Sequence, residues 1–503
     1  MKILSAEQVA KADAYTIEHE PIKSIDLMER AAKACFDWIH FKYDKNERFS
    51  IFCGVGNNGG DGLVIARMLF EKGYTINVIV VAFSDKHSPD FTTNLQRLKK
   101  INPESIQTFT AEKFVLESDG SIIIDAIFGS GLNRPSAGFV AEIIAEINNS
   151  EKEVISIDIP SGLFMEDNQK NNTDGIVRSS FTLSLELPKL AFLFSENQDF
   201  VARWITLPIG LDRQFIAEQE SAYRYVDAAE VQKRIKVRKP FSHKGTFGHA
   251  LLAGGSKGMI GAAILMAGGC LRSGVGLVTT VVPQCGYPIM QVAVPEALCL
   301  NLQEINILSG AMRTDGYESI GIGPGIGTHR RTVSWLVQIL NKIKVPLVLD
   351  ADALNILAEN DAMLQLVPKG TILTPHPGEL DRLAGKSTSG YARMERQKLF
   401  AMQYGVYVVL KGRHTSIATP EGDVYFNSSG NAGMATGGSG DVLTGLITGL
   451  RAQGYDALNA SLIGVYIHGR AGDLGADENS EEALVAGDLI KFIGKAFKEI
   501  NKV

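Results

Sequence analysis

The sequence predicts an α/β protein of two domains. Its 503 residues exceed the usual length of one domain, about 100–200 residues, and 45% hydrophobic and 21% charged residues are typical of a globular chain. In both halves, short apolar runs alternate with helical segments. Buried strands that alternate with helices indicate βαβ units and a parallel sheet in each domain. We place the boundary near residue 226, giving domains 1–225 and 226–503.

The first half begins with two helical patterns. Ser5 followed by Gln8 is a capping-box pattern, and apolar residues then recur at helical spacing between residues 28 and 39. Strand-like apolar runs follow at 49–56, 76–83, 121–129 and 153–162. Helical segments lie between them, near 61–72, 90–100 and 136–148. This half is therefore expected to form a sheet with helices between its strands.

The second half shows the same alternation. Its strand-like runs lie at 249–255, 277–282, 319–323, 346–352, 371–375 and 406–412, and a long helical region follows Asp441. The uncharged stretch 273–295 contains three prolines, so we interpret it as strand and loop and not as a membrane helix. The basic, polar segment 212–245 is expected to be a solvated helix and linker, although residues 243–248 could instead contribute to a phosphate site.

Charge and cysteine content exclude several classes of protein. The net charge of −6 is too mild for a protein that binds nucleic acid or a membrane surface. Five cysteines without a C-x-x-C pair argue against a disulfide framework or a zinc finger and favour a cytoplasmic protein. Glu7, Lys11 and Asp13 interrupt the apolar core that a signal peptide would need.

The glycine-rich segment GVGNNGGDG (54–62) follows a predicted strand and opens a predicted helix. Glycines at this place let backbone N–H groups approach a ligand at the helix N-terminus. Asn57, Asn58 and Asp61 add amide and carboxylate groups, which suit a hydroxylated or cationic ligand better than a bare pyrophosphate. The alternative is a polar turn in which Asp61 caps the helix.

Two further carboxylates, Asp125 and Asp158, end apolar strands and precede Gly/Ser loops. Three carboxylate-bearing loops at one sheet edge indicate a site. Oxygen atoms of Asn58, Asp125 and Ser161 could hold a hard monovalent or divalent cation, which leaves Asp158 for proton transfer. Arg134, in the loop 129–135, is a plausible partner for a phosphate group.

Five motifs occur in order in the first half: LMERAA (27–32), GVGNNGGDGLVIARML (54–69), DAIFGSGL (125–132), DIPSGL (158–163) and LPK (187–189). Together they resemble the NAD(P)H-hydrate epimerase domain over roughly residues 1–225. The resemblance implies a Rossmann-like three-layer α/β/α fold, epimerisation of NADHX and NADPHX at the hydrated nicotinamide carbon, and potassium on Asn58, Asp125 and Ser161. The hydrate-binding residues that it implies are Asn57, Asn58, Gly59, Gly60, Asp61, Gly129, Ser130, Gly131, Leu132, Asn133, Arg134, Pro135 and Asp158.

The segment GNAGMATGGSGDVLTGLITGL (430–450) is the most informative in the chain. Four small residues, 437–440, precede Asp441, and an apolar helix follows. Free N–H groups at the start of that helix would bind phosphate, and Asp441 could take a proton from a nearby hydroxyl. The alternative is a simple helix-terminal carboxylate after a flexible loop. The chain has no G-x-x-x-x-G-K-[ST] motif, and G-[AS]-G-D before a helix resembles the ribokinase-like fold instead.

Other loops of the second half lie at predicted strand ends. Lys411 and Arg413 could neutralise phosphates or occupy a surface turn. GIGPGIG (321–327) leaves backbone free to approach a ligand. His376 lies between two prolines that would fix its imidazole ring, for a ligand contact or a structural role. The segment 254–269 is a glycine turn into a helix, where the glycines serve either a ligand or helix packing.

The motifs HKGTFGHALLAGGSKGMIGAA, GIGPGIG, LVLDADALN, LTPHPGELDRL, LKGRHT and NAGMATGGSGDVL resemble the ADP-dependent (S)-NAD(P)H-hydrate dehydratase domain over roughly residues 226–503. The resemblance implies that Ala262, Gly325, His376 and Asp441 contact the hydrate. The residues that it implies for binding the nucleotide are Lys411, Gly412, Arg413, His414, Thr415 and Gly440. Mg²⁺ is expected for phosphoryl transfer, although no dedicated metal motif is visible. Ala432 stands where this family often has Pro.

These expectations describe a fused metabolite-repair enzyme. Its first domain would interconvert the R and S hydrates, and its second would dehydrate the S hydrate with ADP as co-substrate, releasing AMP and phosphate. One alternative is a ribokinase-like kinase for a sugar or vitamin, which would not need the segment 54–62. Another is a binding protein for modified nucleotides in RNA, which the acidic balance disfavours. We expect small-molecule partners, no nucleic acid, no membrane, and a homo-oligomer.

Overall fold

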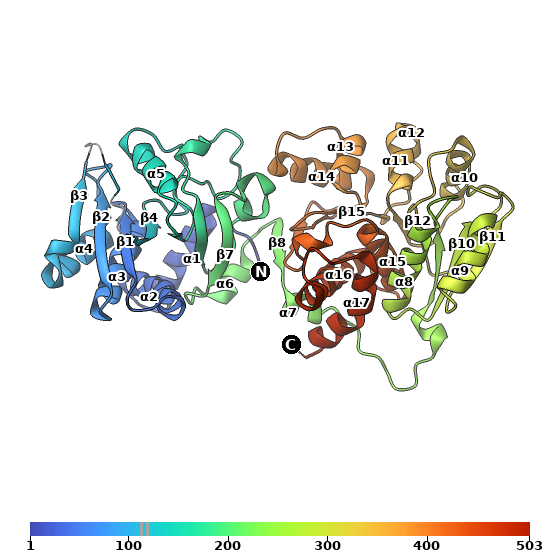
Figure 1. Ribbon diagram of the computed structural model, residues 1–503, viewed down its shortest axis with the longest axis horizontal. Helices are drawn as coiled ribbons and strands as arrows, with labels where there is room; N and C mark the ends of the chain where they lie inside the picture. Colours follow the sequence, from blue (N-terminus) through green and yellow to red (C-terminus); the bar gives the residue numbers. More distant parts are fainter. Residues whose placement is uncertain (111–113, 117–119, 503) are drawn as a thin grey trace. The chain divides into compact units, whose positions relative to one another are not determined.

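The computed structural model describes residues 1–110, 114–116 and 120–502, and the chain divides into two compact units. The first unit comprises Lys2–Ser221 with Ser389–Tyr391, and the second comprises Ala222–Thr388 and Ala392–Val503 with Met1. Residues 222–225, which we had placed in the first domain, lie in the second unit, because strand β8 (Tyr223–Val226) pairs with its last strand. Figure 1 shows the helices and strands of each unit.

The first unit contains a seven-stranded parallel sheet in the order β3-β2-β1-β4-β5-β6-β7. Its strands are β1 (Arg48–Cys53), β2 (Thr75–Val81), β3 (Ile106–Phe109), β4 (Ile122–Ala126), β5 (Val154–Ile157), β6 (Ser179–Leu185) and β7 (Val201–Leu207). Its helices are α1 (Ala6–His19), α2 (Ser24–Lys42), α3 (Asn57–Glu71), α4 (Pro89–Ile101), α5 (Phe139–Asn149) and α6 (Arg213–Glu218).

Alternate strand residues build separate cores on the two faces of this sheet. Ile51 and Cys53 of β1 pack with α2, α3 and α4, whereas Phe52 between them packs with α5 on the opposite face. This alternation follows from the pleat of the strand, which points successive side chains to opposite faces. Helices on both faces confirm the predicted three-layer α/β/α, Rossmann-like arrangement (Figure 1).

The start of the first unit follows the predicted capping box. The Ser5 hydroxyl accepts a hydrogen bond from the Gln8 backbone N–H at 3.3 Å, and the Gln8 side-chain oxygen accepts one from the Ser5 N–H at 3.0 Å. These two bonds satisfy backbone donors that have no partner within helix α1. They fix where α1 begins, and α1 supplies one wall of the cavity described below.

The second unit contains a ten-stranded sheet in the order β11-β10-β9-β12-β13-β14-β15-β16-β17-β8, antiparallel only where β16 pairs with β15 and β17. Its remaining strands are β9 (His249–Ala253), β10 (Leu277–Pro283), β11 (Leu298–Leu302), β12 (Ser319–Ile322), β13 (Leu347–Leu349), β14 (Ile372–Leu373), β15 (Tyr407–Leu410), β16 (Ser416–Ala418) and β17 (Val424–Asn427). Its helices are α7 (Ala228–Gln232), α8 (Ile260–Arg272), α9 (Tyr287–Ala293), α10 (Arg330–Leu340), α11 (Asp352–Ala358), α12 (Asp361–Leu364), α13 (Pro377–Ala384), α14 (Gly390–Tyr404), α15 (Ser439–Ala452), α16 (Ala457–Asn479) and α17 (Ala486–Ile500).

Helices α8 and α15 cross with their backbones in direct contact. A Cβ atom on Gly445 would lie 1.8 Å from the Met266 carbonyl oxygen, and one on Gly269 would lie 2.2 Å from the Val442 carbonyl oxygen. Since no side chain fits at these distances, glycine is required at both positions. The glycines late in segment 254–269 therefore serve helix packing, and they fix the position of α15, which carries Asp441.

Two expectations for the second half need correction: the one for the stretch 273–295, and the one that segment 243–248 could contribute to a phosphate site. The stretch 273–295 is not only strand and loop, because its second half forms helix α9. Pro288 stands in the first turn of α9, where a missing N–H costs no hydrogen bond, so proline there starts a helix. Within the described residues, no helix is both long and apolar enough to cross a membrane.

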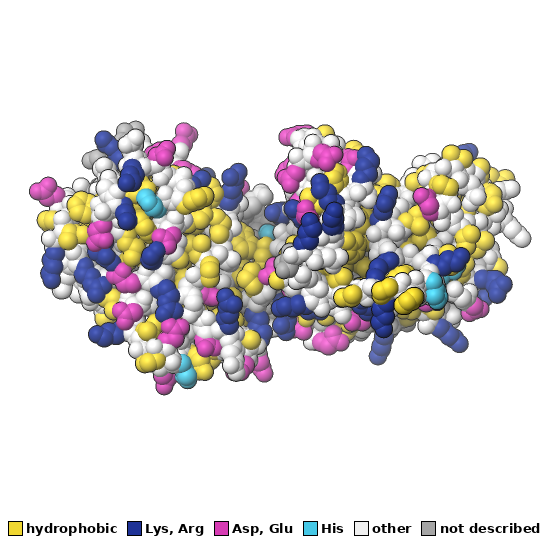
Figure 2. Space-filling view, turned by 90° about the horizontal axis from the view of Figure 1, so that it is seen from below, with side chains coloured by type: hydrophobic (Ala, Val, Ile, Leu, Met, Phe, Trp, Pro, Cys, Tyr) yellow, Lys and Arg dark blue, Asp and Glu magenta, His cyan; other side chains and the backbone are white. Residues whose placement is uncertain are grey.

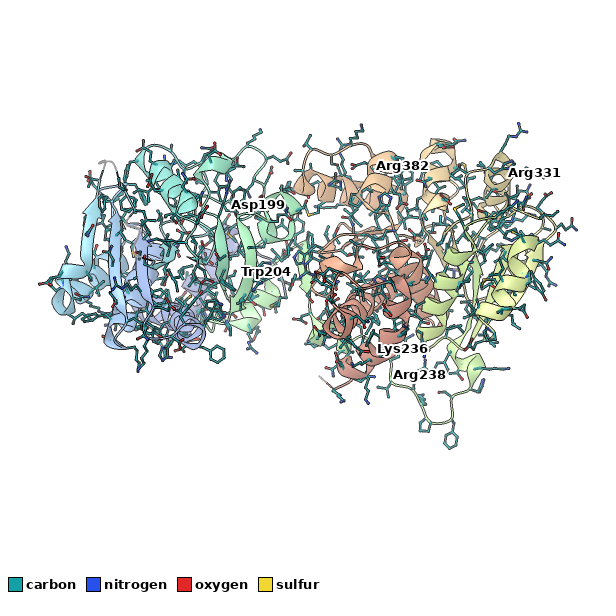
Figure 3. The ribbon with its side chains drawn as sticks, in the orientation of Figure 1. Asp199, Trp204, Lys236, Arg238, Arg331 and Arg382 are labelled. Carbon is teal, nitrogen blue, oxygen red and sulfur yellow. The ribbon has the colours of Figure 1, made fainter. Side chains whose placement is uncertain are left out.

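The basic linker of the second unit packs far from Asp441. The Lys236 ammonium lies 4.6 Å from the Tyr455 ring centre, and Arg238 stacks 3.9 Å from the Phe247 ring centre (Figure 3). A Cβ atom on Gly248 would collide with the carbonyl oxygen of Ala452, the last residue of α15. A 14-residue helix spans about 20 Å, so segment 243–248 lies at the wrong end of α15 to help bind phosphate beside Asp441.

Candidate functional sites

The first unit contains a cavity of about 820 Å³, here called the N-terminal cavity, at the carboxyl ends of β1, β4 and β5. Eleven of the thirteen residues expected to bind the hydrate line it: Asn57, Asn58, Asp61, Gly129, Ser130, Gly131, Leu132, Asn133, Arg134, Pro135 and Asp158. Gly59 and Gly60 do not. A Cβ atom on Gly59 would lie 1.7 Å from the Gly54 carbonyl oxygen, and one on Gly60 would lie 2.7 Å from the Met28 sulfur, so both glycines serve packing.

Helix α3 carries Asp61 into this cavity. The helix begins at Asn57, so Asp61 lies beyond its first turn and does not cap it, contrary to the alternative interpretation. Its side chain is buried, and no hydrogen bond to its carboxyl group occurs within the described part of the chain. Burial, reinforced by repulsion from Asp158 and Asp13, raises the pKa of Asp61 well above its usual range. The raised pKa favours the protonated form of Asp61, which can donate a hydrogen bond.

Asp158 is held ionised by a buried lysine. The Lys189 ammonium, which is 1% exposed, lies 2.6 Å from the Asp158 carboxylate and also donates to the carbonyl oxygens of Leu185 and Leu187. The Ser130 N–H donates to the other carboxylate oxygen at 3.1 Å. Burial alone would raise the pKa of Asp158, but Lys189 and Ser130 outweigh it and hold this pKa below its usual range.

The backbone at Asp158 is in the left-handed region, with φ of 67°. Residues other than glycine seldom adopt this conformation, and asparagine and aspartate do so most readily. The turn is maintained because the Asp158 N–H donates to the Leu183 carbonyl oxygen at 2.8 Å. The strained turn aims the carboxylate at Lys189 and the cavity, and such strain is concentrated at functional sites.

The predicted cation ligands meet around the carbonyl group of Phe128. The Asn58 side-chain amide donates to this carbonyl oxygen at 2.9 Å, and the Ser161 hydroxyl lies 3.2 Å from it. Ser161 donates to the buried Asp125 carboxylate from both its hydroxyl, at 2.5 Å, and its N–H, at 2.8 Å. The Asn58 side-chain oxygen is buried and has no hydrogen-bond partner in the described regions.

This arrangement fits a monovalent cation. The unpartnered Asn58 oxygen, the Asp125 carboxylate and a backbone carbonyl group are hard oxygen donors of low total charge. Burial raises the pKa of Asp125 in spite of four hydrogen bonds to it, so an adjacent cation would favour its ionised form. No cluster of three or more His, Cys, Asp or Glu side chains suited to a metal occurs among the described residues.

The sequence interpretation misses two charged residues: Asp13, which lines the N-terminal cavity, and Lys189, which pairs with the cavity residue Asp158. Lys189 belongs to the LPK motif but received no role, although an isolated charge beside the apolar run LAFLF is a usable signal. Asp13 was noted only as a charge near the N-terminus. It lies four residues after Val9 and four before Ile17, on the apolar face of α1. A carboxylate on an apolar helix face was the available signal.

In the second unit, Asp441 lies in the first turn of α15. Gly438 caps this helix in the left-handed conformation, with φ of 89°, and the N–H groups that follow have no carbonyl partner within the helix. A Cβ atom on Gly440 would lie 3.2 Å from the Lys411 ammonium and 3.7 Å from the Asp350 carboxylate. The glycine loop, the helix start and an ion pair therefore meet at one place.

The ion pair of this site joins Lys411 to Asp350. The Lys411 ammonium lies 2.8 Å from Asp350 and 3.9 Å from Glu379, and Thr444 of α15 donates to the second Asp350 oxygen at 2.6 Å. Burial lowers the pKa of Lys411, but these carboxylates outweigh that effect and raise it. Lys411 is thus a permanent cation beside Asp441. We had predicted Lys411 but not Asp350, Glu379 or Thr444, which lie far from it in sequence.

Asp441 has the protonation behaviour of a general base. Burial, together with repulsion by Asp350, raises its pKa to about 7, although Lys411 opposes the shift. General acid–base catalysis is most efficient when the pKa of the group lies near the working pH. Asp441 can therefore accept a proton at neutral pH, next to N–H groups and a cation that can hold phosphate.

The other predicted residues of the loop 411–415 have different environments. Gly412 and Arg413 are exposed, and Arg413 donates to the Gly430 carbonyl oxygen. Burial lowers the pKa of His414 to about 4, and its ring contacts the Asn427 carbonyl oxygen at 3.2 Å, so it is neutral. The Thr415 hydroxyl donates to the Gly412 carbonyl oxygen at 3.0 Å and shapes the turn.

The remaining predicted contacts, His376, Gly325 and Ala262, also lie at strand ends or in helix starts. His376 caps α13, because its ring nitrogen Nδ1 accepts from the N–H groups of Gly378 and Glu379. Its side chain is half exposed, and its other ring nitrogen, Nε2, lies 3.5 Å from the buried Glu379 carboxylate. A Cβ atom on Gly325, whose φ is 67°, would lie 3.1 Å from that of Ala262, so these two positions adjoin.

Comparisons with known proteins match both units. The family model described as YjeF-related protein N-terminus matches residues 24–191, and the model described as NAD(P)H-hydrate dehydratase matches residues 250–495. A bifunctional NAD(P)H-hydrate repair enzyme of Moorella thermoacetica is 34% identical over 522 aligned positions, covering 100% of this chain and 98% of its own length. The corresponding enzyme of Escherichia coli K12 is 31% identical, covering 92% of this chain and 88% of its own length.

One solved structure supports the fold of the second unit. A ribokinase-like superfamily protein of Enterococcus faecalis V583 superimposes with a TM-score of 0.50 at 24% identity, covering 57% of this chain and 99% of its own length. This likeness confirms the predicted ribokinase-like fold. Both family models and full-length relatives above 30% identity agree, so the chain belongs to the family of bifunctional NAD(P)H-hydrate repair enzymes.

Proposed function

We propose that this chain repairs hydrated nicotinamide dinucleotides. The first unit interconverts the R and S epimers of NADHX and NADPHX, and the second converts the S epimer to NADH or NADPH with ADP as co-substrate. The observation that carries the proposal is the position of Asp441, a carboxyl group with a pKa of about 7 in the first turn of α15 beside Lys411. Phosphoryl transfer to a hydroxyl group requires this combination of base, cation and N–H donors.

In the second unit, Asp441 removes the proton from the hydroxyl group of the S hydrate. The freed oxygen attacks the terminal phosphoryl group of ADP, which releases AMP. The N–H groups at the start of α15 and the Lys411 ammonium stabilise the charge that develops on the phosphoryl oxygens. The phosphate ester is a better leaving group than hydroxide, so phosphate departs with its bonding electrons. Loss of a proton from the neighbouring carbon restores the double bond.

Two ions complete this proposal. Mg²⁺ neutralises phosphate charge when bound, and the carboxylates that act electrostatically on Asp441, those of Asp350 and Asp352, are the residues suited to hold it. In the first unit, Asn58, Asp125 and Ser161 would hold potassium, whose charge would orient the loop 127–131. Of the residues expected to hold ADP, Lys411, Arg413 and Gly440 have the chemistry to contact its phosphates, and His376, Ala262 and Gly325 would contact the hydrate.

The experiment that tests the function follows absorbance at the reduced-nicotinamide band. The full chain is given ADP, Mg²⁺ and a mixture of NADHX epimers, and recovery of the whole NADH signal is expected. Asp158→Asn should consume only the S fraction rapidly, because the R fraction then depends on spontaneous epimerisation. No recovery by the wild-type chain, or full rapid recovery by Asp158→Asn, would contradict the assigned activities.

Potassium dependence is a separate expectation for the first unit. Replacing potassium by tetramethylammonium, whose methyl groups keep its charge away from oxygen ligands, should slow epimerisation of the R hydrate. Asn58→Leu should remove this dependence along with most of the activity, because it deletes the unpartnered oxygen. The rate on purified S hydrate is the control. An epimerisation rate that ignores the cation would refute potassium binding at these residues.

We further propose that the chain is cytoplasmic and forms a homo-oligomer. All five cysteines are free thiols, which suits a reducing compartment. The edge strand β11 and the adjacent helix α9 expose apolar side chains, among them Val292 at 84%, Leu298 at 56% and Leu300 at 48%. Exposed apolar edges of this kind favour association between chains. A monomeric mass in light scattering at micromolar concentration would refute the oligomer.

A further inference from the structure

The N-terminal cavity contains a carboxyl group that the proposed chemistry has not used. Asp13 comes from α1, a different element from β5 and α3, which supply Asp158 and Asp61. Val9 and Ala10 of the same helix also line the cavity, so this part of α1 forms its wall. Across the described residues, no hydrogen bond or ion pair engages the Asp13 side chain. The Asp13 carboxyl group is therefore partly buried in the cavity wall, and no contact among the described residues gives it a structural role.

Four charged groups act on Asp13 from the surrounding elements. Asp158 and Glu186 repel its carboxylate form, Lys189 attracts it, and Asp61 interacts with it across the cavity. Burial, followed by repulsion from Asp158, raises the pKa of Asp13 to about 6. Lys189 already forms its short ion pair with Asp158, which is therefore ionised before the reaction begins. Of these two carboxyl groups in one cavity, Asp13 thus binds a proton at a higher pH than Asp158 does.

Inversion at the hydrated carbon needs one group that gives a proton and another that accepts one. The hydroxyl group must leave from one face of the ring as water, which requires an acid. Water must then add to the other face, which requires a base. Environments that push the pKa values of two groups apart assign these two roles. Asp158, which Lys189 holds ionised at the start of the reaction, can supply the base for the R hydrate but not the acid.

We propose that Asp13 is a second proton-transfer residue of the N-terminal cavity, acting with Asp158 on the hydroxyl group of the nicotinamide hydrate. This inference rests on the proposed epimerase function. Asp13 gives its proton to the leaving hydroxyl group, the C–O bond breaks with its electrons on oxygen, and the ring nitrogen lone pair forms a C=N bond. A water molecule forms the new C–O bond from the other face and gives its proton to Asp158.

The step is balanced, because one water leaves and one water enters, one proton is donated and one accepted, and nothing is oxidised. At the end Asp13 is ionised and Asp158 is protonated. The opposite epimer reacts through the same pair with the roles exchanged, as microscopic reversibility requires. Asp61, whose raised pKa favours the protonated form, can donate a hydrogen bond and does not take part in the transfer.

The test compares Asp13→Asn with wild type and with Glu7→Gln in the full chain. Glu7 lies on the same helix, is exposed, and pairs only with Lys11, so its variant matches the loss of one negative charge. Conversion of purified (R)-NADHX is followed through the chain's own dehydration step with excess ADP. Asp13→Asn should slow this conversion by about 10²–10⁴-fold, the usual contribution of an acid–base residue. Its rate on purified S hydrate, like both rates of Glu7→Gln, should equal wild type.

The pH profile separates proton transfer from a structural effect. For the pH profile, the R and S hydrates are separated by chromatography in the absence of ADP, because the dehydration step has its own pH dependence through Asp441. Wild-type epimerisation of the R hydrate should fall as pH rises through about 6, because Asp13 must be protonated to act, and Asp13→Asn should lack this limb. Asp13→Glu should regain part of the rate and show the limb at a different pH. Thermal melting is recorded for each variant. If Asp13→Asn does not fold, the profile of Asp13→Glu decides.

The outcomes distinguish this inference from the function on which it rests. Wild-type chain that leaves (R)-NADHX unconverted would refute the epimerase function itself. Wild-type chain that converts it, with Asp13→Asn equally fast and with an unchanged profile, would overturn the role of Asp13 and leave the function intact. The role of Asp13 would also be overturned if the falling limb of the pH profile lay at the same pH in Asp13→Glu as in wild type.

Discussion

Replacing Asp441 by asparagine is expected to reduce dehydration of the S hydrate by about 10²–10⁴-fold, the usual range for loss of a general base. Asparagine keeps the shape of the side chain and its place in the first turn of α15, but it cannot accept a proton. The Michaelis constant for ADP should change little, because the N–H groups and Lys411 remain. The measurement is NADH formation from purified S hydrate at saturating ADP and Mg²⁺.

The pH dependence of the same reaction follows from the raised pKa of Asp441. Below a pH of about 7 the carboxyl group is protonated and cannot act as a base, so the rate should rise with pH and level off above that value. Asp477→Asn, at an exposed position of α16, is the matched control and should retain the wild-type rate and profile. An Asp441→Asn variant with near wild-type turnover would refute the kinase-like chemistry.

Replacing Lys189 by methionine is expected to destabilise the first unit by about 3–5 kcal/mol, the usual cost of removing one partner of a buried ion pair. The variant leaves the Asp158 carboxylate buried, 7% exposed, without its cation. Adding Asp158→Asn to Lys189→Met should recover much of this loss, since neither charge then remains. The free energy of unfolding is measured by urea denaturation. Lys33→Met, which breaks an exposed pair on α2, should change it by less than about 1 kcal/mol.

The stability that the Asp158–Lys189 ion pair contributes is expected to decrease at acid pH. The pKa of Asp158 is lower in the folded chain than in the unfolded chain, so the folded state binds fewer protons. The stabilisation is present above a pH of about 4, the ordinary value for aspartate, and is lost as pH falls below it. Lys189→Met should lack this acid-dependent component. Wild-type stability in that variant would show that the ion pair does not stabilise the unit.

The sequence predicts those parts of the fold that depend on local pattern. Continuous apolar runs correctly locate β1, β2, β4 and β5, because strands buried on both faces need no polar residues. Strand β6 escapes prediction because its Ser and Thr side chains interrupt the run, and these hydroxyls are buried only through contacts with neighbouring strands. Strand β7 lies at the edge of the sheet and includes the exposed Arg203, whereas the next residue, Trp204 (labelled in Figure 3), packs against Phe192 with ring centres 5.6 Å apart.

The same limit applies to the residues of the two sites: those with a local sequence signal can be predicted, and the others cannot. Asp125, Asp158 and Asp441 can be found because each follows a glycine-rich or apolar signal at a strand or helix end. The roles of Lys189 and Asp350 cannot be predicted in this way, because they come from ion pairs with residues 31 and 61 positions away; for Lys189 the only sequence signal is a charge beside the apolar run LAFLF. Figure 2 shows both acidic and basic side chains on the face of the molecule that is in view.

The glycine contact between α8 and α15 limits how the site around Asp441 and Lys411 can be redesigned. Side chains can be shortened to enlarge most binding sites, but here the separation of the two helices is already limited by carbonyl oxygens at Met266 and Val442. A bulkier co-substrate must therefore be accommodated by altering the loops, since neither helix can be trimmed further. A methyl group added at the crossing would force α8 and α15 apart and so displace Asp441, which lies at the start of α15.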